Sequence, residues 1–145
     1  MTTLGLAMLK HQLRRDEGSS LESYHDPAGN LSIGCGHNID AHGITITPDL
    51  EEKILEEDIA RAMTELDAAC PWVQDLDEVR QRVLYNMAFN LGTAGLLKFQ
   101  RTMDAVKAGQ YTEAAAFMLR SIWAGQVGQR ADRLSEMMRT GVDAA

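Results

Sequence analysis

Hydrophobic residues recur every three or four positions through most of the chain, which is the spacing of amphipathic helices. Leu6, Leu9 and Leu13 mark the first stretch of this kind. We expect its helix to run to about Asp16 and to end at Gly18, because glycine commonly terminates helices.

The longest helical pattern follows Thr47-Pro48-Asp49. This triplet combines a capping hydroxyl, a proline at the first helical position and an acid in the first turn, which together predict a helix start. Apolar residues then continue at helical spacing to about Ala69, and the step into Pro71 ends the pattern. We expect this long helix to link a small β-containing lobe to a larger helical lobe.

Several shorter helical patterns follow in the C-terminal half of the chain. Asp77 is placed to cap a helix that ends at Gly92, and its core stripe consists of Val79, Val83, Met87 and Leu91. We expect further helices at residues 95–97, 101–108, 114–122 and 129–139. The sequence therefore predicts a second lobe that is entirely helical.

Between the first helix and the long helix, the pattern changes to short alternating stretches that are typical of strands. Residues 23–26 and 31–35 are expected to pair as a hairpin around a turn at residues 27–30, where proline, glycine and asparagine supply the turn chemistry. Residues 38–43 are expected to form a loop, and residues 44–46 a third strand.

Length and composition indicate one globular domain, or two small lobes that share a core, because 45% of the 145 residues are hydrophobic. The net charge of −7 argues against nonspecific nucleic-acid binding, which requires basic patches. A local basic face is still expected near the C-terminus, from Arg120, Arg130, Arg133 and Arg139. No apolar run is long enough to span a bilayer, so we expect no stable membrane association.

The chain holds two cysteines, which are too few for a disulfide scaffold. Cys35, His37, Asp40 and His42 are close in sequence, but their spacing matches no common zinc motif. We therefore expect neither a metal site nor a cofactor.

Two acids and a hydroxyl are the candidate chemical groups. Glu17 and Asp26 are nine positions apart, and Ser32 follows six positions later. Two carboxyl groups in different environments can divide the work of cutting a glycosidic bond between a proton donor and an ionised group. Each acid also has a simpler interpretation, since Glu17 could be a solvated helix-end carboxylate and Asp26 a turn residue.

The order of these motifs resembles a known family. The motifs are Asp16-Glu17-Gly18, Tyr24-His25-Asp26 and Ser32-Ile33-Gly34-Cys35-Gly36-His37, followed by residues 86–92, 95–99, 129–133 and 139–141. Together they resemble the phage-type lysozymes, which are the endolysin muramidases of the T-even phage lysozyme-like glycoside hydrolase family. The resemblance covers nearly the whole chain.

The resemblance implies a mostly α (α+β), lysozyme-like, two-lobed fold. A small lobe with a short antiparallel β-sheet, a long linking helix and a helical C-terminal lobe would form a single domain over residues 1–145. The small lobe would span about residues 13–58, and the second lobe about residues 70–145 together with the N-terminal helix.

The resemblance also assigns roles to the candidate residues. Glu17 would be the general acid that protonates the leaving oxygen, and Asp26 would stabilise the positive charge on the sugar and orient the attacking water. Ser32 stands where the family usually has threonine, and it keeps the hydroxyl that holds a water. The family usually inverts the anomeric configuration, and we expect the same here.

Further residues match the family's cleft and its supporting pairs. Three residues match family positions that line the sugar cleft: Asn38, Phe89 and Thr102. Phe89 could equally be a core residue. Two more residues match positions that form supporting charge pairs in the family. Arg130 is expected to pair with Glu17, and His37 with Asp58. Phe117 stands where the family can offer a polar contact, while Trp72 and Trp123 are expected in the core.

The implied function is hydrolysis of the β-1,4 bond between N-acetylmuramic acid and N-acetylglucosamine in bacterial peptidoglycan, for host cell lysis. The enzyme would be a monomer, made in the host cytoplasm without a signal peptide and released to the wall by a holin-type protein. Two alternatives remain: a lytic transglycosylase, against which Asp26 argues, and a non-enzymatic peptidoglycan-binding module, against which the intact set of Glu17, Asp26 and Ser32 argues.

Overall fold

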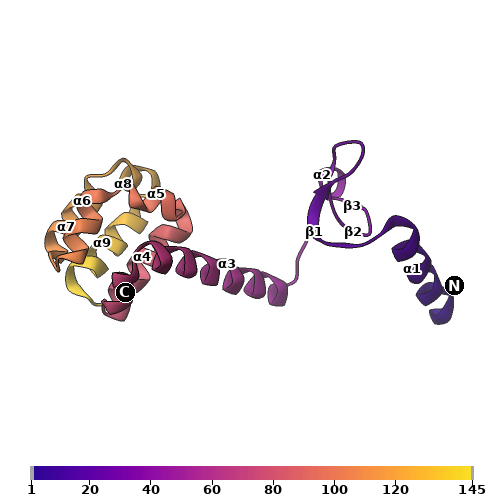
Figure 1. Cartoon of the computed structure of the whole chain (residues 1–145), viewed down its shortest axis with the longest axis horizontal. Coiled ribbons are helices and arrows are strands. Elements are labelled where there is room, and N and C mark those ends of the chain that lie inside the picture. The colour runs from indigo at the N-terminus through magenta and orange to yellow at the C-terminus, as the bar shows by residue number, and fades with distance from the viewer. Residues whose placement is uncertain (1, 145) are drawn as a thin grey trace. The chain divides into compact units, whose positions relative to one another are not determined.

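The computed structural model describes residues 2–144, with the backbone alone for residues 4 and 5, and it is mostly helical with a three-stranded antiparallel sheet (Figure 1). This confirms the mostly α, lysozyme-like α+β fold class that the sequence predicts. The chain divides into two compact units, residues 1–48 and residues 49–145. Each unit is described by itself.

The first unit begins with helix α1 (Thr3–Glu17), which confirms the predicted helix and its end at Gly18. Strands β1 (Ser20–His25) and β2 (Leu31–Gly34) then pair antiparallel around the expected turn. Pairing begins at Ser20, three residues before the predicted strand, and the register is interrupted between Ser20 and Tyr24.

The third strand is not the predicted one. Residues 44–46 form no strand, whereas β3 (His37–Asn38) pairs with β2 directly after a turn. Gly34 and Gly36 both have positive φ, 67° and 81°, and this left-handed backbone lets the chain return at once. Helix α2 (Ile39–His42) occupies the expected loop.

In the second unit, α3 (Pro48–Ala69) and α4 (Glu78–Leu91) lie where the sequence predicts them. The Asp77 carboxylate caps α4 by accepting a hydrogen bond from the Arg80 backbone N–H at 3.0 Å. A 3₁₀ helix, η1 (Pro71–Asp75), fills the connection and was not predicted.

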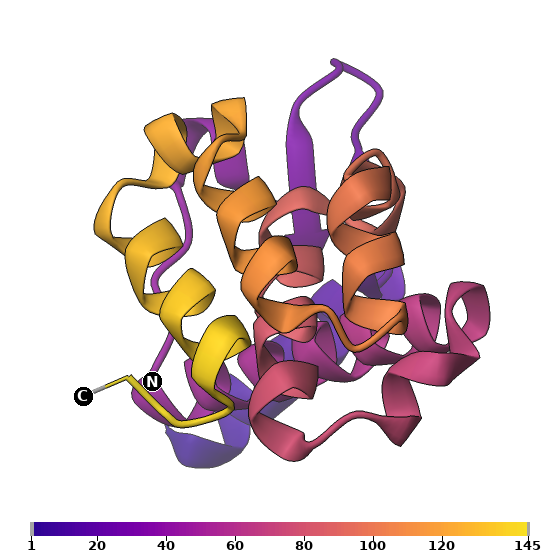
Figure 2. The same ribbon diagram turned by 90° about the vertical axis from the view of Figure 1, so that its left-hand side faces the viewer.

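The remaining helices are α5 (Thr93–Leu97), α6 (Gln100–Lys107), α7 (Tyr111–Leu119), α8 (Ile122–Val127) and α9 (Gln129–Thr140). One predicted helix, residues 114–122, is instead divided between α7 and α8. The division follows from Ser121, whose hydroxyl accepts a hydrogen bond from the Ala124 N–H at 3.2 Å and starts α8 as a new helix. Helices α7 (orange) and α9 (yellow) lie side by side (Figure 2).

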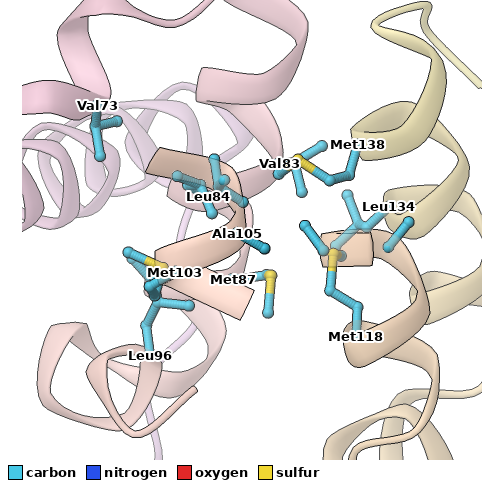
Figure 3. Packing of buried hydrophobic residues seen from close by; sticks show 14 of the residues in the cluster. Val73, Val83, Leu84, Met87, Leu96, Met103, Ala105, Met118, Leu134 and Met138 are labelled. Atoms are coloured by element: carbon cyan, nitrogen blue, oxygen red, sulfur yellow. The ribbon is translucent and has the colours of Figure 1, made fainter. Parts of the chain in front are cut away.

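The core of the second unit is built from aliphatic and methionine side chains that meet between α4, α6, α7 and α9 (Figure 3). Val83 and Met87 of the predicted stripe are fully buried. Trp123 is also buried, with its ring edge-on to Phe99 and its Nε1 donating to Asn90 Oδ1 at 2.9 Å. Trp72 packs against the same core, so both tryptophans are core residues as predicted.

Helix α3 contributes little to this core. Within α3 only Leu66 is buried, although its apolar stripe includes Leu55, Ile59 and Met63. None of the described helices combines the length and the apolar character needed to cross a membrane.

Candidate functional site

Glu17 is the last residue of α1, and its side chain is exposed. Gly18 follows with a φ of 76°, a left-handed conformation that ends the helix without strain in glycine. The preceding Asp16 forms an ion pair with Arg15, with Nε and Oδ1 2.7 Å apart. The Glu17 side chain makes no hydrogen bond or ion pair with any described residue, and it is exposed, so its carboxyl group faces solvent.

Asp26 follows β1 directly and is held by the hairpin turn. Its Oδ1 accepts a hydrogen bond from the Asn30 backbone N–H at 2.8 Å, and its Oδ2 accepts one from Asn30 Nδ2 at 3.2 Å. These bonds, the backbone one first, hold the pKa of the Asp26 carboxyl below its usual value. The turn therefore fixes the position of Asp26 and favours its ionised form.

Ser32 lies in the middle strand, where it is opposite Tyr24 of β1 and Asn38 of β3. Its side chain is 1% exposed. Since side chains alternate between the faces of a strand, the register places Ser32, Tyr24 and Asp26 on one face of the hairpin. The fold thus brings two of the three predicted catalytic groups to the same face.

Asn38 and His37 both make local contacts in the first unit. The Asn38 side chain caps α2, its Oδ1 accepting a hydrogen bond from the Ala41 N–H at 2.9 Å. His37 Nε2 lies 2.7 Å from the Gly43 carbonyl oxygen, to which it donates. The sugar contact of Asn38 stays a prediction beside this capping role.

Phe89 and Arg130 line one groove of about 520 Å³ in the second unit, between α3, α4 and α9. Phe89 is 45% exposed, which excludes the alternative that it is a core residue of this unit. Arg130 is fixed by Asn86, whose Oδ1 accepts from Arg130 Nε at 2.9 Å and from Nη2 at 2.6 Å. The opposite wall of the groove is apolar and comes from the stripe of α3.

Thr102 lines a different groove, of about 440 Å³, and its side chain is 2% exposed. The groove lies where α6 begins and where α7 meets α8. Phe117 also lines it, half-buried. The two predicted sugar-binding residues of the second unit, Phe89 and Thr102, therefore line separate grooves.

The predicted supporting pairs join residues of different units. Asp58 of α3 forms an ion pair with Arg61, with Nη2 and Oδ1 3.0 Å apart, and Arg130 contacts Asn86. The pairing of His37 with Asp58 and that of Arg130 with Glu17 stay predictions.

Sequence reasoning missed two residues of the site, Asn30 and Asn86. Asn30 fixes Asp26, and the turn sequence Asp-Pro-x-Gly-Asn could have indicated this, because aspartate in a turn commonly accepts hydrogen bonds from the following residues. Asn86 fixes Arg130 from 44 positions away, and no local pattern marks that contact.

No metal-ligating cluster stands out among residues 2–144. Within that range, no three histidine, cysteine, aspartate or glutamate side chains are grouped so that they could hold an ion. Cys35 is exposed and Cys70 is buried, and both are free.

Comparison with known proteins agrees with the motifs. The phage lysozyme family profile matches residues 14–138. Probable T4-type lysozyme 2 of Dictyostelium discoideum is 26% identical over 94% of this chain and 96% of its own length.

Two phage proteins are also similar. The pre-baseplate central spike protein Gp5 of Enterobacteria phage T4 is 28% identical over 92% of this chain but only 28% of its own length. The endolysin of Salmonella phage P22 is 30% identical over 56% of this chain and 58% of its own. With the family profile covering most of its length, this chain belongs to the phage lysozyme family, a family of lysozyme-like cell-wall hydrolases.

Proposed function

We propose that this protein hydrolyses the β-1,4 glycosidic bond between N-acetylmuramic acid and N-acetylglucosamine in bacterial peptidoglycan. The observation that carries the proposal is the Asp26 turn. A carboxylate with a lowered pKa, fixed by Asn30, shares a face of the hairpin with the Ser32 hydroxyl. This is the arrangement of an ionised group that stabilises a positive sugar and a hydroxyl that holds a water.

In this mechanism Glu17 supplies the proton to the leaving oxygen. Its exposed position at the end of α1 leaves the carboxyl accessible to a substrate. As the glycosidic bond breaks, the Asp26 carboxylate stabilises the developing oxocarbenium ion. A water held by Ser32 then attacks the anomeric carbon and passes its proton to Asp26.

The second unit supplies the sugar-binding walls in this proposal, through Phe89 and Thr102, while Asn38 contributes from the first unit. Arg130, held by Asn86, would pair with Glu17, and His37 would pair with Asp58. We further propose that the N-terminal helix belongs to the helical lobe. Its apolar stripe of Leu6, Leu9 and Leu13 is 37–46% exposed in the described structure, so it is available for packing.

We also propose that the biological role is that of an endolysin, which acts as a monomer on the wall during host lysis. The P22 endolysin among the similar proteins supports this role. In this proposal a separate holin-type protein delivers the enzyme to the wall.

The direct experiment is digestion of purified peptidoglycan, with the released ends identified by mass spectrometry. Reducing N-acetylmuramic acid ends are the expected product. Anhydro-muramic acid ends would instead identify a transglycosylase, and wall binding without any cleavage would identify a binding module.

A further inference from the structure

Three exposed aliphatic side chains lie at helix junctions of the second unit. Ile122, the first residue of α8, is 84% exposed, and Leu119, the last residue of α7, is 48% exposed. Leu97, the last residue of α5, is 38% exposed. Among the described residues that follow α3, the only other large hydrophobic side chains with comparable exposure are those of Phe89 and Val142. The exposed aliphatic surface of these helices is therefore concentrated at their junctions.

Three exposed cations accompany these side chains. Lys98 follows Leu97 and Arg120 follows Leu119, and both line one groove together with Arg101 and Ser121, the neighbour of Ile122. No acid lines this groove, and in the described part of the chain none of the three cations forms an ion pair with a carboxylate. We call this surface the basic-apolar edge, and it consists of Leu97, Lys98, Arg101, Leu119, Arg120 and Ile122.

The negative charge of the protein is concentrated elsewhere. Helix α3 carries eight acidic and only two basic residues, which accounts for most of the net charge of −7. Residues 70–145 carry nine basic and eight acidic residues, so the helices that present the basic-apolar edge have no net negative charge. The three cations can therefore attract an anionic surface without strong repulsion from the helices around them.

We propose that the basic-apolar edge binds reversibly to the surface of a bilayer that contains anionic lipids, a property that goes beyond the proposed function. The cations would contact the headgroup phosphates, while the aliphatic side chains enter the boundary between headgroups and acyl chains. A nucleic acid offers phosphates but no apolar phase in which Ile122 and Leu119 could be buried, so the pairing of cations with aliphatic residues favours a membrane. Such peripheral contact needs no membrane-spanning helix.

The test is sedimentation of the full chain with lipid vesicles at low salt. The parent should pellet with vesicles of phosphatidylethanolamine and phosphatidylglycerol but not with vesicles of phosphatidylcholine alone, and added salt should release it because the attraction is screened. Leu119→Gln/Ile122→Gln keeps every charge but removes the aliphatic side chains, so the partition coefficient should fall about tenfold. The matched control is Val142→Gln, 64% exposed and outside the groove lining, which should keep the parent value.

The vesicle experiment contains no peptidoglycan, so its result is independent of the proposed function. Absence of pelleting, equal pelleting with both kinds of vesicle, or an unchanged partition coefficient for Leu119→Gln/Ile122→Gln would each overturn the proposal. Sedimentation velocity without lipid tests the other occupant of the edge, a second copy of the chain. A parent dimer that dissociates in the double variant would assign the edge to that copy and would also overturn the proposal.

Discussion

Each of the two units of this protein is stabilised internally by a different kind of interaction. In residues 49–145 a continuous core of aliphatic, methionine and tryptophan side chains is excluded from water. In the described part of residues 1–48, the only buried side chain is that of Ser32, and the remaining order comes from strand pairing and turn hydrogen bonds. The second unit is thus stabilised by hydrophobic burial, whereas the first is organised by polar contacts.

The comparison bears on function because the predicted catalytic groups, Glu17, Asp26 and Ser32, all lie in the first unit. Segments that bind ligands are commonly drawn from the less stable parts of a protein. The buried hydrophobic core therefore lies in the helical unit, and the predicted catalytic groups lie in the small unit.

The largest expected effect is on the free energy of unfolding, when the same substitution, Leu to Ala, is made in each unit. Leu84→Ala, at a fully buried position of α4, should lower the free energy of unfolding by about 2–5 kcal/mol. Leu21→Ala, at a position of β1 that is 97% exposed, should change it by less than about 0.5 kcal/mol. Urea denaturation followed by circular dichroism measures the free energy of unfolding of both variants. Equal losses would contradict the conclusion that hydrophobic burial stabilises mainly the second unit.

A second pair of variants tests how the C-terminal segment is held to α4. The Arg80 guanidinium donates to the carbonyl oxygens of Met138 at 2.8 Å and Arg139 at 3.2 Å, and it lies 3.6 Å from the centre of the Tyr111 ring. Arg80→Met should therefore cost about 2 kcal/mol of unfolding free energy.

The matched control is Arg82→Met, also on α4, whose ion pair with Asp143 is exposed and should contribute less than about 1 kcal/mol. Thermal unfolding of the two variants ranks them. A larger loss for Arg82→Met would show that the partly buried Arg80 is not what holds α9 to α4.

A third variant tests whether the N-terminal helix belongs to the helical lobe. If this helix belongs to the helical lobe, as we propose, Leu9→Ala should lower the free energy of unfolding by about 1 kcal/mol, because part of a buried leucine side chain would be lost. Lys10→Ala, beside the apolar stripe, is the control. Hydrogen exchange should show reduced protection in the helical lobe for Leu9→Ala alone, and unchanged protection would place the helix outside the lobe.

The smallest effect concerns the Asp26 carboxyl. Asn30→Ala keeps the backbone N–H but removes the side-chain amide, whose Nδ2 donates to Asp26 Oδ2. The pKa of Asp26 should therefore rise toward its usual value. Because the pKa is lowered in the folded protein, the stabilisation is present above the pKa of the unfolded chain and is lost as the pH falls through the folded value. Carbon-13 NMR titration follows this carboxyl, and an unchanged pKa would show that the Asn30 side chain does not contribute and that the backbone N–H alone lowers it.

The helical unit could be predicted closely because its helices follow local rules of capping and periodicity. Asp77, Gly92 and the stripe through Met87 define α4 without tertiary information. The small unit was harder. β3 is only two residues long, His37–Asn38, and its pairing depends on a glycine turn rather than on an alternating pattern.

Candidate site residues could be predicted from the sequence only where they lie in a recognisable motif. Glu17 and Asp26 were singled out by motifs at a helix end and beside a turn that resemble the family, and their roles stay predictions. Asn86 could not be found in this way, since its contact with Arg130 is made only by the folded chain. The basic residues that line the groove at Thr102 were missed as a group, because Lys98 and Arg101 meet Arg120 only when α6 packs beside the junction of α7 and α8.

Proton transfer by Glu17 alone, as proposed, can be tested by comparing two adjacent carboxyl groups at the end of α1. Glu17→Gln should lower kcat on purified peptidoglycan about 100- to 10,000-fold, as for the loss of a general acid, with an unchanged thermal unfolding curve. Asp16→Asn, which removes the exposed neighbour paired with Arg15, should leave kcat within about twofold of the parent, since exposed pairs contribute little. Equal activities for the two variants would contradict the account.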